Sequence, residues 1–148
     1  MKKGIESDYR RYWKKICSSK GHIFFQLTLL YDSGDCGAFT VIADSLPVKT
    51  CMMLAVDAVR KKLTTIEGLN DDPMQRAIVE KWDFQCGYCT SGFILNAHAL
   101  VNEHPDATEE VIEEWLSSNI CRCTTYQEIK EAVLSVLNEQ RGRTRNRR

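Results

Sequence analysis

The pattern of apolar and polar residues differs between the two halves of the chain. Residues 22–69 hold short runs rich in β-branched and aromatic side chains, bounded by glycine, proline and serine, and such runs predict strands. We expect strands over 22–31, 39–43 and 48–56, with a turn over 44–47 that includes Pro47. A last short strand is expected in KKLTTIEGL, ending at Gly68.

After residue 69 the apolar residues recur at helical spacing instead. Asp72 and Pro73 place a capping residue before a proline at the first helical position, which predicts a helix start. Further helices are predicted over 91–103, after Asp106 or Thr108, and over 126–139. The second half is therefore expected to hold four helices.

These patterns predict an α+β protein with two parts. Residues 1–70 are expected to form a mainly β part, residues 71–140 a helical part and residues 141–148 a basic tail. The composition is 43% hydrophobic and 27% charged, which excludes a disordered or fibrous chain. The formal net charge is +0, so no overall positive field favours nucleic acid.

The apolar runs are all shorter than a membrane span needs. The basic N-terminal residues are not followed by the apolar segment of a signal peptide, so we expect a cytoplasmic protein without a membrane partner. Seven cysteines occur in the chain, an odd number that argues against a disulfide framework and favours a metal. They are Cys17, Cys36, Cys51, Cys86, Cys89, Cys121 and Cys123.

Four of these cysteines form two close motifs. Cys86-x-x-Cys89 and Cys121-x-Cys123 supply thiolates, which suit iron–sulfur clusters, zinc and Cu(I). Zinc is usually held by two C-x-x-C motifs, whereas two thiolates one residue apart suit one iron of a rhombic cluster. We therefore expect each motif to bind one iron of a [2Fe–2S] cluster. A zinc-stabilised helical interaction module and four structural cysteines are the alternatives.

The segments QCGYCTSGF and SNICRCTTY resemble the helical [2Fe–2S] domain of the molybdenum hydroxylase family, which includes xanthine dehydrogenases and aldehyde oxidoreductases. The resemblance, over Gly34 to Leu137, implies that Cys86, Cys89, Cys121 and Cys123 hold one [2Fe–2S] cluster. It further implies an electron-transfer subunit of an oxidoreductase complex, without substrate-converting residues of its own. The implied partners are a large subunit that binds molybdopterin and a medium subunit that binds FAD.

The same resemblance assigns roles to two residues beside the proposed cluster. By position, Gln85 corresponds to a residue that contacts the pterin, and Cys123 to the cluster ligand whose sulfur approaches the pterin amine. Electrons would then pass from the molybdenum site toward flavin or another acceptor. His22, His98 and His104 have no ligand-like spacing and are expected to be surface or core histidines.

In the first half the resemblance is incomplete. GDCGAFTV and TCMMLA match the loops of a β-grasp, ferredoxin-like [2Fe–2S] domain, with Cys36 and Cys51 at two ligand positions. Tyr31 and Phe39 stand at the other two, and a phenylalanine offers no donor to iron. The first 30 residues do not match the hairpin and helix of that domain. We expect Cys36 and Cys51 to be the remnant of a second cluster site, and a non-functional remnant subunit is a further alternative.

Overall fold

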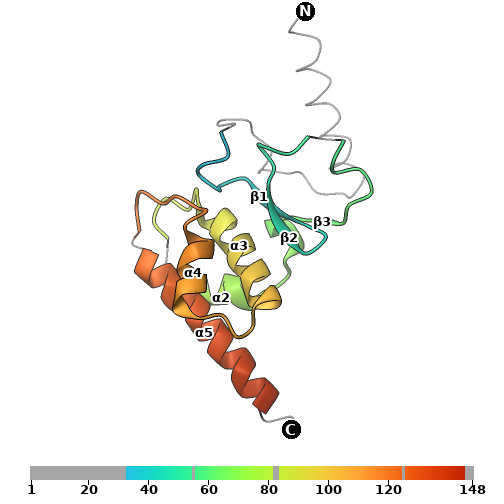
Figure 1. The fold of residues 1–148 in the computed structure, drawn as a ribbon. Helices are drawn as coiled ribbons and strands as arrows, with labels where there is room; N and C mark the ends of the chain where they lie inside the picture. The colour runs from blue at the N-terminus through green and yellow to red at the C-terminus, as the bar shows by residue number, and fades with distance from the viewer. Residues whose placement is uncertain (1–32, 55, 82–83, 125, 146–148) are drawn as a thin grey trace, which may run out of the picture.

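The computed structural model describes residues 33–54, 56–81, 84–124 and 126–145. The predicted strand at 22–31, Tyr31 and Cys17 lie outside these residues. The described elements are β1 (Thr40–Ala43), β2 (Leu46–Lys49), β3 (Leu63–Thr64), a 3₁₀ helix η2 (Ile66–Gly68), α2 (Pro73–Glu80), α3 (Thr90–Glu103), α4 (Glu109–Leu116) and α5 (Tyr126–Arg145) (Figure 1).

The three strands form an antiparallel sheet in the order β2-β1-β3. β1 and β2 are joined by Asp44 and Ser45, which have φ angles of 51° and 83°. Two residues with positive φ close a tight hairpin, so the prediction of a turn over 44–47 was wrong in its length. Pro47 lies instead in the edge strand β2, opposite Ile42, where a missing backbone N–H is tolerated.

Two predicted strands are shorter than expected. β2 ends at Lys49, because hydrogen bonds from Met52 N to Lys49 O at 3.0 Å and from Met53 N to Thr50 O at 3.3 Å turn the chain there. Thr50 itself still contacts the neighbouring strand, since its amide and hydroxyl donate to Phe39 O at 2.8 and 3.0 Å. β3 is limited to Leu63–Thr64, since a 2.9 Å hydrogen bond from Gly68 N to Thr65 O closes the turn of η2. The predicted bounds of both strands were therefore wrong: β2 covers Leu46–Lys49 and not 48–56, and β3 ends at Thr64 and not at Gly68.

The helix starts follow the sequence signals. Asp72 accepts a hydrogen bond from Met74 N at 2.9 Å, and the Gln75 side chain accepts one from Asp72 N at 3.0 Å, so α2 has a capping box with Pro73 at its first position. Thr108, rather than Asp106, is the N-cap residue of α4. All four predicted helices are present.

The last helix is longer than predicted. α5 runs to Arg145, beyond the expected end at residue 139, so residues 141–145 are not a tail. The Arg141 guanidinium donates to Pro105 O and Ala107 O, both at 3.0 Å, and so ties this end of α5 to the loop between α3 and α4.

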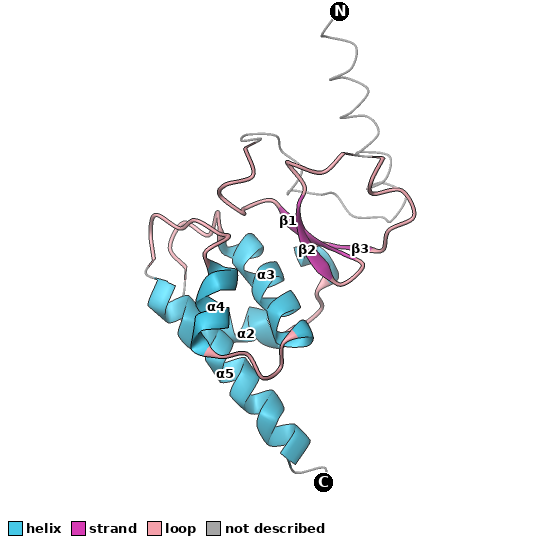
Figure 2. Cartoon of the chain, in the orientation of Figure 1, coloured by secondary structure: helices cyan, strands magenta, loops and turns pink. Residues whose placement is uncertain are grey.

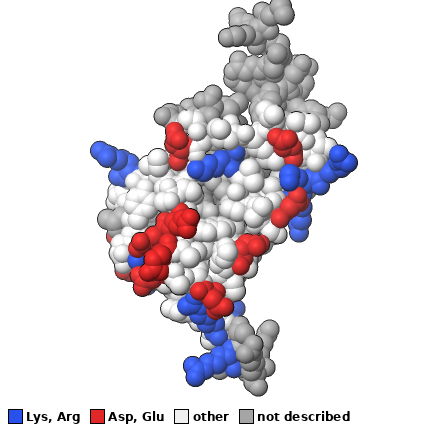
Figure 3. All heavy atoms as spheres, in the orientation of Figure 1, with Lys and Arg blue, Asp and Glu red and all other residues white. Residues whose placement is uncertain are grey.

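The core lies among the four helices, with the small sheet over one side of α3 (Figure 2). Ile42 of β1 packs on Leu95 and Ala99 of α3, so the sheet and the helices share buried surface. Acidic side chains gather over α4 (Figure 3), where Glu109 and Glu113 pair with Lys130 of α5 at 2.8 and 2.7 Å. Within the described ranges, the helices are all too short or too polar to cross a membrane.

Candidate metal centre

The four cysteines of the two motifs lie on neighbouring loops at one end of the helical group. Cys89 is the N-cap residue of α3, and Cys86 lies three residues earlier, across a turn that Gly87 permits with φ +77°. Cys121 and Cys123 lie in the loop that leads into α5. Figure 1 shows the yellow and orange loops that carry the two motifs side by side. Both motifs therefore lie directly before a helix, the first before α3 and the second before α5.

The thiols pair across the motifs rather than within them. Cys86 Sγ lies 3.5 Å from Cys123 Sγ, and the Cys89 and Cys121 thiols share a hydrogen bond. Sequence spacing had suggested that each motif forms its own pair, but in the fold each loop supplies one member of each pair. Among the described residues, no three His, Cys, Asp or Glu side chains converge closely enough to hold a single metal ion.

Each pair contains one thiol that ionises more easily than the other. A hydrogen bond from the Tyr88 backbone, followed by one from the Cys123 thiol, lowers the pKa of Cys86, while sharing that proton raises the pKa of Cys123. Burial, together with the neighbouring Cys121 thiol, raises the pKa of Cys89 to about 12. In each pair, one thiol therefore loses its proton at a lower pH than the other, and a bound cation would displace the protons of both.

Cys121 is held by two groups that its own motif does not include. Partial burial opposes ionisation, but hydrogen bonds from the Thr124 hydroxyl and amide, at 2.9 and 3.3 Å, keep the pKa of Cys121 below its usual value. The Tyr126 hydroxyl accepts from Cys121 N and donates to Asn119 O, both at 3.2 Å. Sequence inspection missed Thr124 and Tyr126, although both stand in the quoted SNICRCTTY segment.

The two pairs differ in their access to solvent. Cys86 and Cys123 are exposed, whereas Cys89 and Cys121 are half-buried against the helical core. Gln85 is also exposed, and its Nε2 donates to Cys123 O at 3.0 Å, so its side chain bridges the two loops. Phe84, Tyr88 and Ile120 expose 37%, 56% and 53% of their surface nearby, giving the exposed pair an apolar surround.

This donor set suits a two-iron cluster. Four thiols from two loops form two close pairs, and a [2Fe–2S] cluster is held by four cysteine thiolates, two on each iron. A structural zinc needs all four sulfurs about 2.3 Å from one ion, whereas among the described residues no three ligand side chains converge on one point. The residues present therefore fit a [2Fe–2S] cluster.

The predicted remnant site in the first half differs from the four-cysteine site in its surroundings. Cys36 and Cys51 are half-buried, on segments that lie together: a Cβ on Gly34 would be 2.6 Å from Met52 Cγ. Phe39 is 8% exposed, and its ring meets the Tyr88 ring edge-to-face with centroids 6.4 Å apart. Where the resemblance places a ligand, the structure has a buried aromatic contact.

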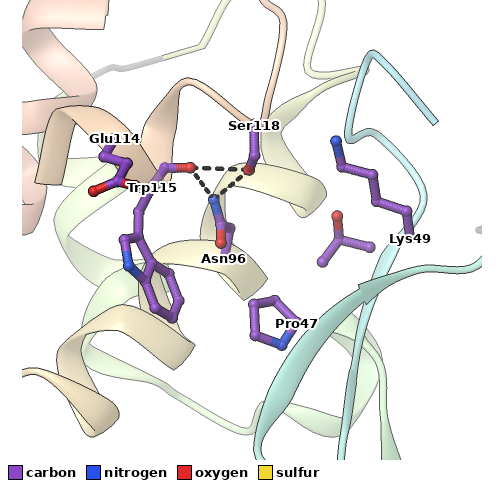
Figure 4. Close-up of a pocket in the computed structure, with 7 residues that line it drawn as sticks. Pro47, Lys49, Asn96, Glu114, Trp115 and Ser118 are labelled. Atoms are coloured by element: carbon purple, nitrogen blue, oxygen red, sulfur yellow. Dashed lines mark hydrogen bonds between the residues drawn. The ribbon is translucent and has the colours of Figure 1, made fainter. Parts of the chain in front are cut away.

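A separate pocket of about 280 Å³ lies between the sheet, α3 and α4, and Ser118 at the start of the Cys121 loop also lines it (Figure 4). Lys49 stands on one side, while Asn96 on the other donates to Trp115 O and Ser118 Oγ at 2.7 and 2.9 Å. Since no cysteine lines it, this pocket is not part of the candidate metal centre.

Comparison with known proteins places these features in one family. Residues 65–134 match the [2Fe-2S] binding domain family. The chain is 46% identical over 104 residues to the nicotinate dehydrogenase small FeS subunit of Eubacterium barkeri, covering 68% of this chain and 66% of that protein. It is 40% identical over 114 residues to 6-hydroxypseudooxynicotine dehydrogenase complex subunit beta of Paenarthrobacter nicotinovorans, covering 72% and 70%.

The fold agrees with a solved structure. A chain of quinoline 2-oxidoreductase from Pseudomonas putida 86 superposes with a TM-score of 0.71 at 30% identity, covering 79% of this chain and 76% of that one. The chain thus spans just under two thirds of the length of several curated relatives, and more of others.

Proposed function

Because this chain belongs to the molybdenum hydroxylase family, as one of its small iron–sulfur subunits, we propose that it transfers electrons within such an oxidoreductase complex. The single observation that carries the proposal is the pairing of four thiols from two loops at an exposed end of the fold. A bound [2Fe–2S] cluster supplies reversible one-electron transfer there. The chain itself supplies ligands and their positions, and no substrate-converting residue.

Cys86, Cys89, Cys121 and Cys123 are the proposed ligands. The pairing of the thiols supports an arrangement in which Cys86 and Cys123 would bind one iron and Cys89 and Cys121 the other. The half-buried pair would face the helical core and the exposed pair the partner. Thr124 would donate hydrogen bonds to the Cys121 sulfur, which stabilise negative charge on it.

The partners would be a large subunit with molybdopterin and a medium subunit with FAD. Gln85 and Cys123 are both exposed and hydrogen-bonded to each other, and we call the surface that they form the rim of the metal centre. This rim suits the expected contact with a pterin on the partner. The exposed Phe84 and Ile120 provide apolar surface beside them, as interface cores commonly do. In the complex, electrons would leave the molybdenum site through this rim.

We further propose that the first half binds no second cluster in the usual way. Phe39 has no atom that can bind iron, and its buried ring occupies a ligand position. This supports the interpretation of Cys36 and Cys51 as the remnant of a second cluster site. Electrons would then have to leave the helical centre without the usual second step.

Metal content and colour test this function. Protein purified without air should contain about two iron atoms per chain, with the visible absorption of a [2Fe–2S] cluster. Zinc without colour would instead support the interaction module, and little metal of any kind the remnant subunit. About four iron atoms per chain would contradict the proposal for the first half.

A further inference from the structure

The segment around Cys36 touches both cysteine loops of the helical part. Residues 36–39 contribute two backbone carbonyl oxygens and one aromatic ring to these contacts. The two loops are separated from this segment by about 50 and 80 residues in sequence, so the contacts bring together three distant stretches.

The loop that carries Cys121 is held by two hydrogen bonds. Ile120 N donates to Cys36 O at 3.0 Å, and Asn119 Nδ2 donates to Gly37 O at 3.0 Å. Asn119 is 1% exposed, and its Oδ1 accepts from Asn96 of α3 at 3.0 Å, so its amide is satisfied on both sides. Because Asn119 and Ile120 directly precede Cys121, these bonds fix the position of the Cys121 backbone relative to residues 36–37.

The fit between these parts is close enough to require glycine. Gly37 has φ +67°, and a Cβ there would lie 2.4 Å from Asn119 Nδ2. A Cβ on Gly92 of α3 would lie 2.2 Å from Gly37 O. Residues 36–39 therefore lie directly against the first turn of α3 and against the Cys121 loop, and a side chain at Gly37 or Gly92 would not fit between these segments.

The loop that carries Cys86 and Cys89 is held by the aromatic pair. Tyr88 stands between these two cysteines, and its ring meets the buried Phe39 ring edge-to-face. Such pairs stabilise beyond the apolar area that they bury. Phe39 is itself fixed, since its carbonyl oxygen accepts both hydrogen bonds from Thr50.

We propose that residues 36–39 form a clamp that sets the position of the two cysteine loops relative to each other. Phe39 and Asn119 are its positioning residues: Phe39 acts on the Cys86–Cys89 loop through Tyr88, and Asn119 ties the Cys121 loop to Gly37. The glycine loop thus serves the helical metal centre instead of a cluster of its own. The clamp itself rests on contacts within the chain, and its effect on a cluster rests on the function proposed above.

The first test needs no metal. In the full chain before cluster loading, Asn119→Leu removes the amide at nearly constant volume, and Phe39→Leu removes the ring. Hydrogen–deuterium exchange should become at least about fivefold faster at residues 119–123 in Asn119→Leu, because this variant loses the bond to Gly37 O and the bonds that Oδ1 accepts from Asn96 and Ser118. It should become about fivefold faster at 85–90 in Phe39→Leu, which loses one weak aromatic contact. Tyr88→Phe keeps the aromatic pair and should leave exchange at 85–90 unchanged. Ile78→Val, a buried change in α2, controls for general loosening.

The second test uses the iron-loaded chain. Both clamp variants should release iron to a chelator about fivefold faster than the parent and change the EPR line shape of the reduced cluster, while Ile78→Val should match the parent. Should Asn119→Leu fail to fold, Asn119→Asp, which loses the donor but keeps the acceptor, replaces it. Exchange rates at both loops equal to those of Ile78→Val would overturn the clamp. Absence of iron in the parent would overturn the proposed function alone, because the exchange result decides the clamp separately.

Discussion

The two cysteine-bearing regions of this chain differ in what each thiol has beside it. In the helical region each of four thiols has another thiol as a neighbour, and the pKa of one member of each pair is lowered. In the first region Cys36 and Cys51 lie on adjacent segments, and the described residue at a third ligand position is the buried Phe39. Matching glycines and cysteines in a sequence therefore does not establish a metal site. A complete set of donors must also lie close together in the fold.

Removal of one proposed ligand from the helical region should have the largest effect on metal binding. Cys121→Ser should abolish stable [2Fe–2S] binding, because serine is a harder and weaker ligand and Cys89 would lose its partner. Cys36→Ser is the matched control, with the same atom change in the remnant site, and should retain about two iron atoms per chain. Iron analysis with visible absorption measures both. Equal loss in the two variants would show that the regions cooperate in one site.

Restoring the two missing donors to the first region should give it a metal site of its own. Phe39→Cys alone should lower the free energy of unfolding by about 3 kcal/mol, because it leaves a cavity where the ring packs on Tyr88. Combined with Tyr31→Cys it completes four cysteines and should raise iron from about two to about four atoms per chain. Chemical denaturation and iron analysis measure these effects. An unchanged iron content in a folded double variant would place the defect beyond the ligands.

Sequence reasoning succeeded where a signal is local. Asp72 and Pro73 identified the start of α2, and the spacing of four cysteines identified the candidate metal centre. It failed at the Asp44–Ser45 turn, because positive φ at those two residues is not signalled as strongly as the proline that follows. The crossed thiol pairs and the partners of Asn119 depend on contacts between distant segments, which residue spacing does not encode.

Asp72, the capping residue of α2, is expected to contribute to the stability of the helical region. Asp72→Ala should lower the free energy of unfolding by about 1 kcal/mol at neutral pH, since it removes the capping box and the 2.7 Å contact to His98. Burial raises the pKa of Asp72, but hydrogen bonds from His98 and Met74 N outweigh it and hold the pKa below its usual value.

The sign of the pH effect follows from that direction. A carboxylate with a lowered folded pKa stabilises above its unfolded value and loses this contribution as the pH falls through the folded value. The difference between Asp72→Ala and the parent should therefore shrink below about pH 4. Denaturant unfolding at several pH values measures it. A difference that grows on acidification would contradict the assigned contacts.

The smallest effect is expected from the hydroxyl that joins the Cys121 loop to α5. Tyr126→Phe removes the bridge between Cys121 N and Asn119 O but keeps the edge-to-face contact with Phe93, at 6.0 Å between centroids. The free energy of unfolding should fall by only about 0.5–1 kcal/mol, because Tyr126 is 42% exposed and water can replace the hydroxyl. Exchange at Cys121 N should nevertheless quicken, while the Cys86–Cys89 loop, held by Phe39 and Tyr88, should be unaffected. Faster exchange in both loops would mean that they move as one unit rather than as two separately clamped arms.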